Sequence, residues 1–72
     1  MGVTVLPSAL RHQMAVRGMS GRELAEVAGV SPASVSHAMA GRPISPATLQ
    51  KICAALATRQ VLEGAAALLG EG

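Results

Sequence analysis

The stretch of residues 20–41, SGRELAEVAGVSPASVSHAMAG, constrains the fold more than any other part of the chain. Ser20 and Glu23 have the spacing of a capping box, in which the serine hydroxyl and the glutamate carboxylate each accept a backbone amide hydrogen. A helix that starts there ends at Gly29, which adopts a left-handed conformation without strain. The dipeptide Ser31-Pro32 is a second helix start. The sequence therefore predicts two short helices joined by one tight turn.

Two short helices cross through such a turn only if the crossing point is small and the turn backbone is permissive, and Ala25 and Gly29 meet these two conditions. In the first helix we expect Leu24, Val27 and Ala28 to face inward. In the second helix the inward residues are expected to be Val35, Ala38 and part of Met39, and Gly41 ends the helix. The outward residues of the second helix are then Pro32, Ala33, Ser36, His37 and Ala40.

Composition favours an all-α fold with a single domain. Half of the 72 residues are apolar, but Phe, Tyr and Trp are absent, so the core must consist of Ala, Val, Leu, Ile and Met side chains. Ala and Leu are strong helix formers, whereas strands prefer β-branched and aromatic residues. A chain of this length forms one small domain.

Further helices are expected on both sides of this stretch. A helix over residues 7–17 is expected, because Leu6, Leu10 and Met14 repeat at four-residue spacing. Ser45-Pro46 repeats the start signal, and a helix over residues 46–56 follows, either stopping there or continuing through 58–60. Its inner face is expected to contain Leu49, Ile52, Cys53 and Leu56.

The two ends of the chain are less regular. Residues 1–5 alternate weakly, and we expect them to be mostly disordered, with a short strand that pairs with a second subunit as the alternative. Residues 61–69 are apolar around much of a fifth helical pattern. Such a helix is either buried within its own domain or covered by a second subunit, and we favour the subunit.

Basic charge gathers around the central stretch. The chain has six cations and four acidic residues, for a net charge of +2. Residues 11–59 contain all six cations but only Glu23 and Glu26, which leaves this span at +4. Such an excess favours a nucleic-acid partner. The cations are Arg11, Arg17, Arg22, Arg42, Lys51 and Arg59.

Nothing in the sequence indicates catalysis, a metal or a membrane. No apolar run reaches the roughly 18 residues of a membrane span, and no signal peptide is recognisable, so we expect a cytoplasmic protein. His12, His37 and Cys53 do not have the spacing of metal ligands, and we expect no cofactor. His12 is interpreted as a surface residue and Cys53 as a small core residue. Ser31 and Ser45 are explained as helix caps, so we expect no enzyme activity.

The central stretch and its flanks resemble the phage-repressor and Cro-like (XRE-type) helix-turn-helix family over about residues 8–57. The matching features are Leu24-Ala25, Ala28-Gly29-Val30-Ser31, Val35-Ser36, Gly41, and the Thr48-Leu49, Ile52 and Leu56 pattern. The resemblance implies a compact four- to five-helix lambda-repressor-like domain that spans residues 1–72, with its core in 7–57. It also implies sequence-specific binding of double-stranded DNA, transcriptional control and commonly a homodimer.

The resemblance also implies which residues meet DNA. The base-reading positions are Pro32, Ala33, Ser36 and His37. The phosphate-contacting positions are Gly21, Arg22, Ser31, Ser34 and Arg42. Many relatives have a phosphate-binding Gln where this chain has Gly21, so one side-chain contact is lost, although a helix N-terminal amide can still bind phosphate.

Two functions follow as hypotheses. The first is a repressor-like regulator that inserts the helix after Ser31 into the DNA major groove and dimerises through residues 61–69. The second is an antitoxin or adaptor whose helix-turn-helix mainly serves contact with a protein. The second is motivated by the apolar tail and by Pro32 and Ala33, which offer only apolar contacts to a base.

Overall fold

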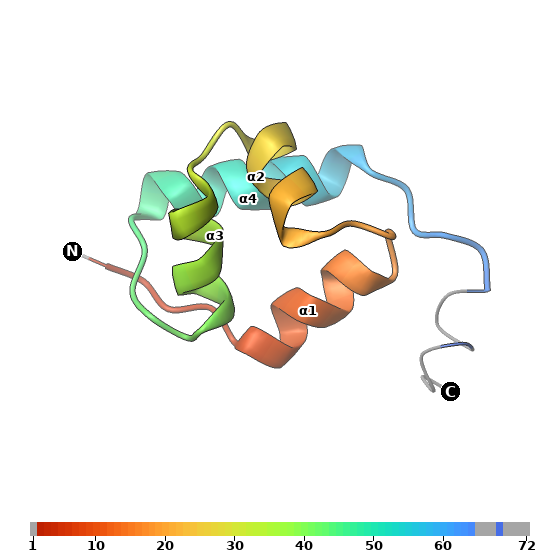
Figure 1. The fold of residues 1–72 in the computed structure, drawn as a ribbon, viewed down its shortest axis with the longest axis horizontal. Helices are drawn as coiled ribbons and strands as arrows, with labels where there is room; N and C mark the ends of the chain where they lie inside the picture. The colour runs from red at the N-terminus through yellow and green to blue at the C-terminus, as the bar shows by residue number, and fades with distance from the viewer. Residues whose placement is uncertain (1, 65–67, 69–72) are drawn as a thin grey trace.

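A computed structural model describes residues 2–64 and residue 68 of the chain. Among these residues are four helices: α1 (Pro7–Ala15), α2 (Gly21–Ala28), α3 (Pro32–Met39) and α4 (Pro46–Thr58). In Figure 1, α1 runs along the lower edge and α4 along the upper edge, and α3 closes one side between them. α2 packs against both α3 and α4. The predicted all-α fold with a helix-turn-helix is confirmed.

Serine caps begin three of the helices, as the sequence predicts. The hydroxyl oxygens of Ser20, Ser31 and Ser45 each accept the amide hydrogen of the residue three positions later, at 3.1–3.2 Å. At Ser20 the capping box is complete, because the Glu23 carboxylate accepts the Ser20 amide hydrogen at 3.3 Å. Proline occupies the first turn of α1, α3 and α4, where a backbone N–H is not needed. Local sequence therefore sets where these helices start.

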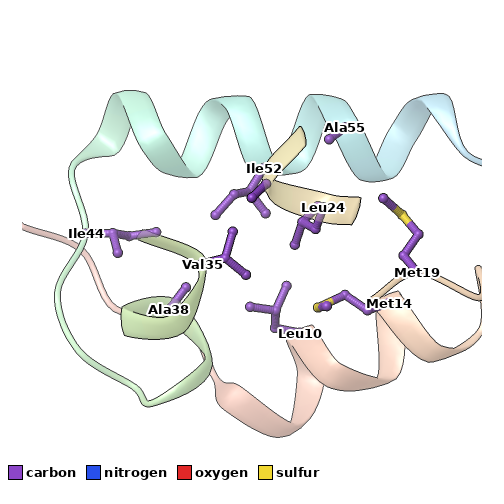
Figure 2. Close-up of a cluster of buried hydrophobic side chains, with 10 residues drawn as sticks. Leu10, Met14, Met19, Leu24, Val35, Ala38, Ile44, Ile52 and Ala55 are labelled. Carbon is purple, nitrogen blue, oxygen red and sulfur yellow. The ribbon is translucent and has the colours of Figure 1, made fainter. Parts of the chain in front are cut away.

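The core consists of aliphatic and methionine side chains from all four helices and the segments between them (Figure 2). Its largest fully buried side chains are Leu24 of α2, Val35 of α3 and Ile52 of α4. Leu10 of α1 joins the same cluster. The remaining buried members are Met14, Met19, Ala25, Ala38, Ile44 and Ala55. Because every helix contributes to one cluster, the placement of α3 depends on the other three.

The inner face of α4 differs from the prediction at one position. Cys53, expected in the core, is exposed, and Ala55 is buried instead. The face that meets the core follows Leu49, Ile52 and Ala55 in steps of three residues. Each residue turns a helix by about 100°, so Cys53 is rotated away from Ile52 toward solvent.

Two more residues predicted to face inward are exposed. Leu6 is 73% exposed and Val27 is 43% exposed. Leu6 precedes the first turn of α1 and has an extended backbone, so the helical face begins only at Leu10. In α2 the fully buried residues are Leu24 and Ala25. The short α2 therefore buries a narrower face than its apolar pattern indicates.

The N-terminal segment pairs with the loop after α3, so the prediction that residues 1–5 are mostly disordered is wrong for residues 2–5. Val3 and Ile44 form an antiparallel bridge, with the Val3 amide donating to Ile44 at 2.7 Å and the Ile44 amide donating to Val3 at 2.8 Å. The side chains of Val3 and Val5 pack against the core. The bridge satisfies the backbone N–H and C=O groups of the buried Ile44. The partner of Val3 therefore lies in the same chain and not in a second subunit.

The chain leaves α4 in an extended conformation at Arg59. Residues 61–64 are not helical, so the helix expected over 61–69 does not begin at residue 61. The Leu62 amide instead donates to the Val16 carbonyl oxygen at 2.7 Å, next to the end of α1. The rest of that expected helix, except Leu68, lies outside the described residues.

Two arginines bind the carboxyl ends of other helices. Arg11 donates from Nη2 to the Met39 carbonyl oxygen of α3 at 3.3 Å, and Arg17 donates from Nε to the Leu56 carbonyl oxygen of α4 at 2.9 Å. The last carbonyls of a helix lack partners within it and form the negative end of its dipole, so a cation is favourable there. No helix in the described part of the chain has the length and apolar character needed to cross a membrane.

Candidate nucleic-acid interface

Gly29 makes the turn that sets α3 against α2. Its backbone is left-handed, with φ 70° and ψ 34°. The amides of Gly29 and Val30 both donate to the Ala25 carbonyl oxygen, at 2.9 and 3.1 Å, which closes α2. A Cβ at this position would meet no atom within 4 Å, so backbone conformation and not space favours glycine. Ser31 then starts α3 directly, as predicted.

One face of α3 is buried in the core, and the opposite face is exposed to solvent. Val35 and Ala38 are 2% and 0% exposed and lie in the cluster that contains Leu24 and Ile52 (Figure 2). Met39 is half-buried. The exposed residues of the helix and of its carboxyl-terminal cap are Pro32, Ala33, Ser36, His37 and Ala40. The predicted division of α3 into an inner and an outer face is confirmed.

The four predicted base-reading residues share this exposed face, but few of them can form hydrogen bonds. Pro32 and Ala33 offer only apolar surface. Ser36 and His37 carry polar groups, yet neither side chain matches the bidentate pairs that discriminate bases by about 1–3 kcal/mol each. Contact of these residues with bases stays a prediction.

The two serines at the start of α3 bind each other. Ser31 Oγ accepts the Ser34 amide hydrogen at 3.2 Å, and the two hydroxyl oxygens are 3.0 Å apart. One hydroxyl donates to the other, so only one hydroxyl hydrogen of the pair stays available for a phosphate oxygen. The predicted phosphate contacts of Ser31 and Ser34 are therefore not independent, and both stay predictions.

The start of α2 places Gly21 and Arg22 side by side in the chain. A Cβ on Gly21 would lie 3.6 Å from the Met39 sulfur and 3.7 Å from Cγ1 of Val35, which is ordinary contact. The Arg22 side chain is 87% exposed and pairs with Glu26 at 3.6 Å. Exposed pairs of this kind contribute about 0–1 kcal/mol, so Arg22 can exchange Glu26 for a phosphate at little cost.

Arg42 follows α3 in the loop to α4. Its backbone amide donates to the His37 carbonyl oxygen at 2.9 Å, which ties the loop to the last turn of α3. Its side chain is exposed and makes no hydrogen bond or ion pair with any other described residue. The guanidinium group is thus uncommitted next to the end of the exposed helix.

The six cations divide into two sets that the sequence does not distinguish. Arg11 and Arg17 donate to backbone carbonyls, and Arg59 pairs with Glu23 at 3.6 Å. These interactions depend on the fold, because it brings carbonyls and a carboxylate from distant positions in the chain close to the three arginines. The cations outside this structural set are Arg22, Arg42 and Lys51. Bonds to carbonyls leave the charges of Arg11 and Arg17 in place, but fewer side chains are uncommitted and able to bind phosphate than the six cations of the sequence indicate.

The candidate site is a surface and not a pocket. Across residues 2–64 and 68, no pocket is found, and no three His, Cys, Asp or Glu side chains gather in a group that would hold a metal ion. The outer face of α3, flanked in the chain by Arg22 and Arg42, is the surface that both the sequence and the fold single out.

Comparison with known proteins identifies the helix-turn-helix itself. A sequence model of the helix-turn-helix family matches residues 15–59. The match begins at the last residue of α1 and ends at the residue after α4, so it contains α2, the turn at Gly29, α3 and all of α4. No curated protein and no solved structure matches the chain.

Proposed function

The chain belongs to the XRE-type helix-turn-helix family of DNA-binding regulators, and on this basis we propose that it binds double-stranded DNA with α3 in the major groove. The observation that carries the proposal is the presentation of α3. Its buried residues Val35 and Ala38 fix it from one side, and its opposite face is exposed. A major groove about 12 Å wide admits one such helix.

The site residues divide by chemistry into those that contact bases and those that contact phosphates. Ser36 and His37 form hydrogen bonds with base edges, and Pro32 and Ala33 contact apolar groups such as the thymine methyl. The groups that meet backbone phosphates are Gly21, Arg22, Ser31 or Ser34, and Arg42. Because few hydrogen bonds read bases directly, DNA shape contributes a substantial part of the specificity.

The regulator acts as a repressor by occupying promoter DNA, and it performs no chemistry of its own. It binds as a homodimer that uses residues 61–69. Supporting this, Val61, Leu62 and Leu68 are 54%, 53% and 89% exposed, although all three are large apolar side chains. A dimer places two copies of α3 about 34–36 Å apart, in successive major grooves.

A selection from a random duplex library, followed by affinity measurements on the selected sequence, tests DNA binding. We expect His37→Ala to weaken binding to the selected duplex about twofold to tenfold, the effect of one hydrogen bond. Gln50→Ala, on an exposed position of α4, is the control and leaves the affinity unchanged.

Arg42→Ala tests the phosphate contact on the same duplexes. It weakens binding to all sequences and reduces the slope of log affinity against log salt by about 0.9. Lys51→Ala removes the same charge from α4, which lies outside the α2–turn–α3 unit. It leaves the salt dependence of the affinity closer to that of the unmodified chain. Unchanged binding in both His37→Ala and Arg42→Ala would refute the assigned reading face.

Light scattering at several concentrations tests the homodimer. Leu68→Asp reduces association, whereas Leu6→Asp, which also charges an exposed apolar position, does not. A selected site that is a palindrome with half-sites one helical turn apart supports the dimer. Equal association of the two variants contradicts the assignment of the tail.

The same exposed tail favours the second candidate function, an antitoxin or adaptor that binds a protein. In that case Leu68→Asp abolishes the protein complex and leaves DNA affinity unaltered. A toxin-like reading frame beside the gene supports this function. Specific, salt-dependent DNA affinity of the isolated chain counts against it as the whole function.

A further inference from the structure

At the carboxyl end of α3, the half-buried Met39 packs against the core, and the loop that follows has no buried side chain before Ile44. Ala38 is the last fully buried residue of the helix, and the next one along the chain is Ile44. Between them, backbone hydrogen bonds fix the chain: the Gly41 amide donates to Ala38 at 3.1 Å and the Arg42 amide donates to His37 at 2.9 Å. The backbone from His37 to Arg42 is therefore held in part by what secures the loop that ends at Ile44.

The N-terminal segment secures that loop. Val3 and Ile44 exchange two backbone hydrogen bonds, at 2.7 and 2.8 Å. Gly2 lies so close to Pro43 that a Cβ on the glycine would be 2.6 Å from the proline Cβ. The Val3 side chain also packs against the core. These contacts connect the start of the chain to a loop about forty residues later.

Two further contacts from α1 reach the same end of α3. Arg11 donates from Nη2 to the Met39 carbonyl oxygen at 3.3 Å. Pro7 lies beside Gly41, where a built Cβ would be 3.3 Å from the proline Cγ. Residues near the start of the chain thus contact the end of α3 and the loop after it at several positions.

We propose that residues 2–5 position the DNA-reading helix: Val3, through its pair with Ile44, fixes the last turn of α3 and with it His37 and Arg42. Val3 is a positioning residue and touches no DNA itself. The DNA part of this inference rests on the function proposed above, whereas the effect on α3 does not.

The test compares Val3→Pro with Thr4→Pro. Proline at position 3 removes the amide hydrogen that Ile44 accepts. Thr4 is exposed, and its amide makes no hydrogen bond to another described residue, so Thr4→Pro adds the same ring next to the bridge without removing a bond. A third variant, with residues 2–4 deleted, removes the Val3–Ile44 pair without introducing proline. It replaces Val3→Pro in the comparison if Val3→Pro does not fold.

Amide hydrogen exchange is the first measurement. In Val3→Pro we expect the Gly41 and Arg42 amides to exchange about threefold to tenfold faster, the effect of one hydrogen bond, and the Gly29 amide to stay unchanged. Thr4→Pro matches the unmodified chain. Equal rates in the two proline variants overturn the proposal, and so does an equal acceleration at Gly29, because that would be a general loss of stability.

DNA affinity is the second measurement, on a library-selected duplex and a scrambled duplex of the same composition. Val3→Pro lowers the ratio of the selected to the scrambled affinity about threefold to tenfold, because a displaced His37 weakens only the selected duplex. A displaced Arg42 weakens both duplexes alike, since phosphate contacts do not depend on sequence, so an unchanged ratio overturns the positioning of His37. If the unmodified chain prefers no duplex, the proposed function fails, and the exchange rates still decide whether residues 2–5 position α3.

Discussion

Arg17 donates its Nε hydrogen to the carbonyl oxygen of Leu56 at 2.9 Å and so joins the turn after α1 to the last turn of α4. The residue is half-buried, and its Nη1 group also donates to the backbone and side-chain oxygens of Gln13, at 3.0 and 2.7 Å. Three acceptors thus surround one guanidinium group. By sequence alone Arg17 belongs to a basic surface, but in the fold it stabilises the junction of two helices.

Replacing Arg17 by Met is expected to lower the free energy of unfolding by about 1.5–3 kcal/mol, the range for hydrogen bonds to a charged group. Arg22→Met is the control, because its ion pair with Glu26 is exposed, and we expect a change within about 0.5 kcal/mol. Urea unfolding followed by far-ultraviolet circular dichroism measures both, since the chain has no aromatic residue to serve as a fluorescence probe. Equal midpoints for the two variants would show that Arg17 adds nothing at the junction.

Gly29→Ala is expected to destabilise the domain by about 1–2 kcal/mol, because alanine is strained in the left-handed conformation. A Cβ finds no neighbour within 4 Å, so no steric clash adds to this cost. Gly29→Asn is expected to cost less, since asparagine tolerates this conformation better. Urea midpoints in the order Gly, Asn, Ala support this explanation, and equal midpoints for Asn and Ala contradict it.

Gly21→Ala is expected to stabilise the domain by about 0.4–1 kcal/mol, because it restricts the unfolded chain and its Cβ fits without a clash. Gly21→Gln restores the side chain that many relatives use to bind phosphate. We expect it to bind DNA about twofold to tenfold more tightly than Gly21→Ala, which controls for stability. Equal affinities would place position 21 away from the phosphates.

Ala25→Leu is expected to cost about 1–3 kcal/mol, because Ala25 is 2% exposed in a packed core and has no room for a larger side chain. Ala54→Leu makes the same change at an exposed position of α4 and is expected to stay within about 0.5 kcal/mol. Thermal unfolding of both variants measures the difference. Similar melting temperatures would mean that the contact between α2 and α3 tolerates bulk.

The helix-turn-helix was predictable because its signals are local. The caps at Ser20 and Ser31 and the left-handed Gly29 each act within a few residues, and all occur as predicted. The buried Val35 and Ala38 follow from helical periodicity alone. The exposure of the four predicted reading residues follows from the same periodicity, whereas their contacts with DNA stay predictions.

The features missed by sequence reasoning depend on distant partners. No local signal joins Val3 to Ile44 or Arg11 to Met39, since these contacts exist only after the helices pack. The misplacement of Cys53 has another cause. A helix of mixed apolar residues has more than one plausible face, and the face that α4 buries is set by its packing against α2.

The separation of α3 into a buried side and an exposed side has an evolutionary consequence. Because Val35 and Ala38 anchor the helix, substitutions at positions 33, 36, 37 and 40 alter the exposed surface without disturbing the core. Mutations at these positions are therefore nearly neutral for folding, and under the proposed function those at 33, 36 and 37 change which sequence is recognised. A scaffold of this kind lets new target specificities arise one substitution at a time, and it suits laboratory libraries that randomise the four positions.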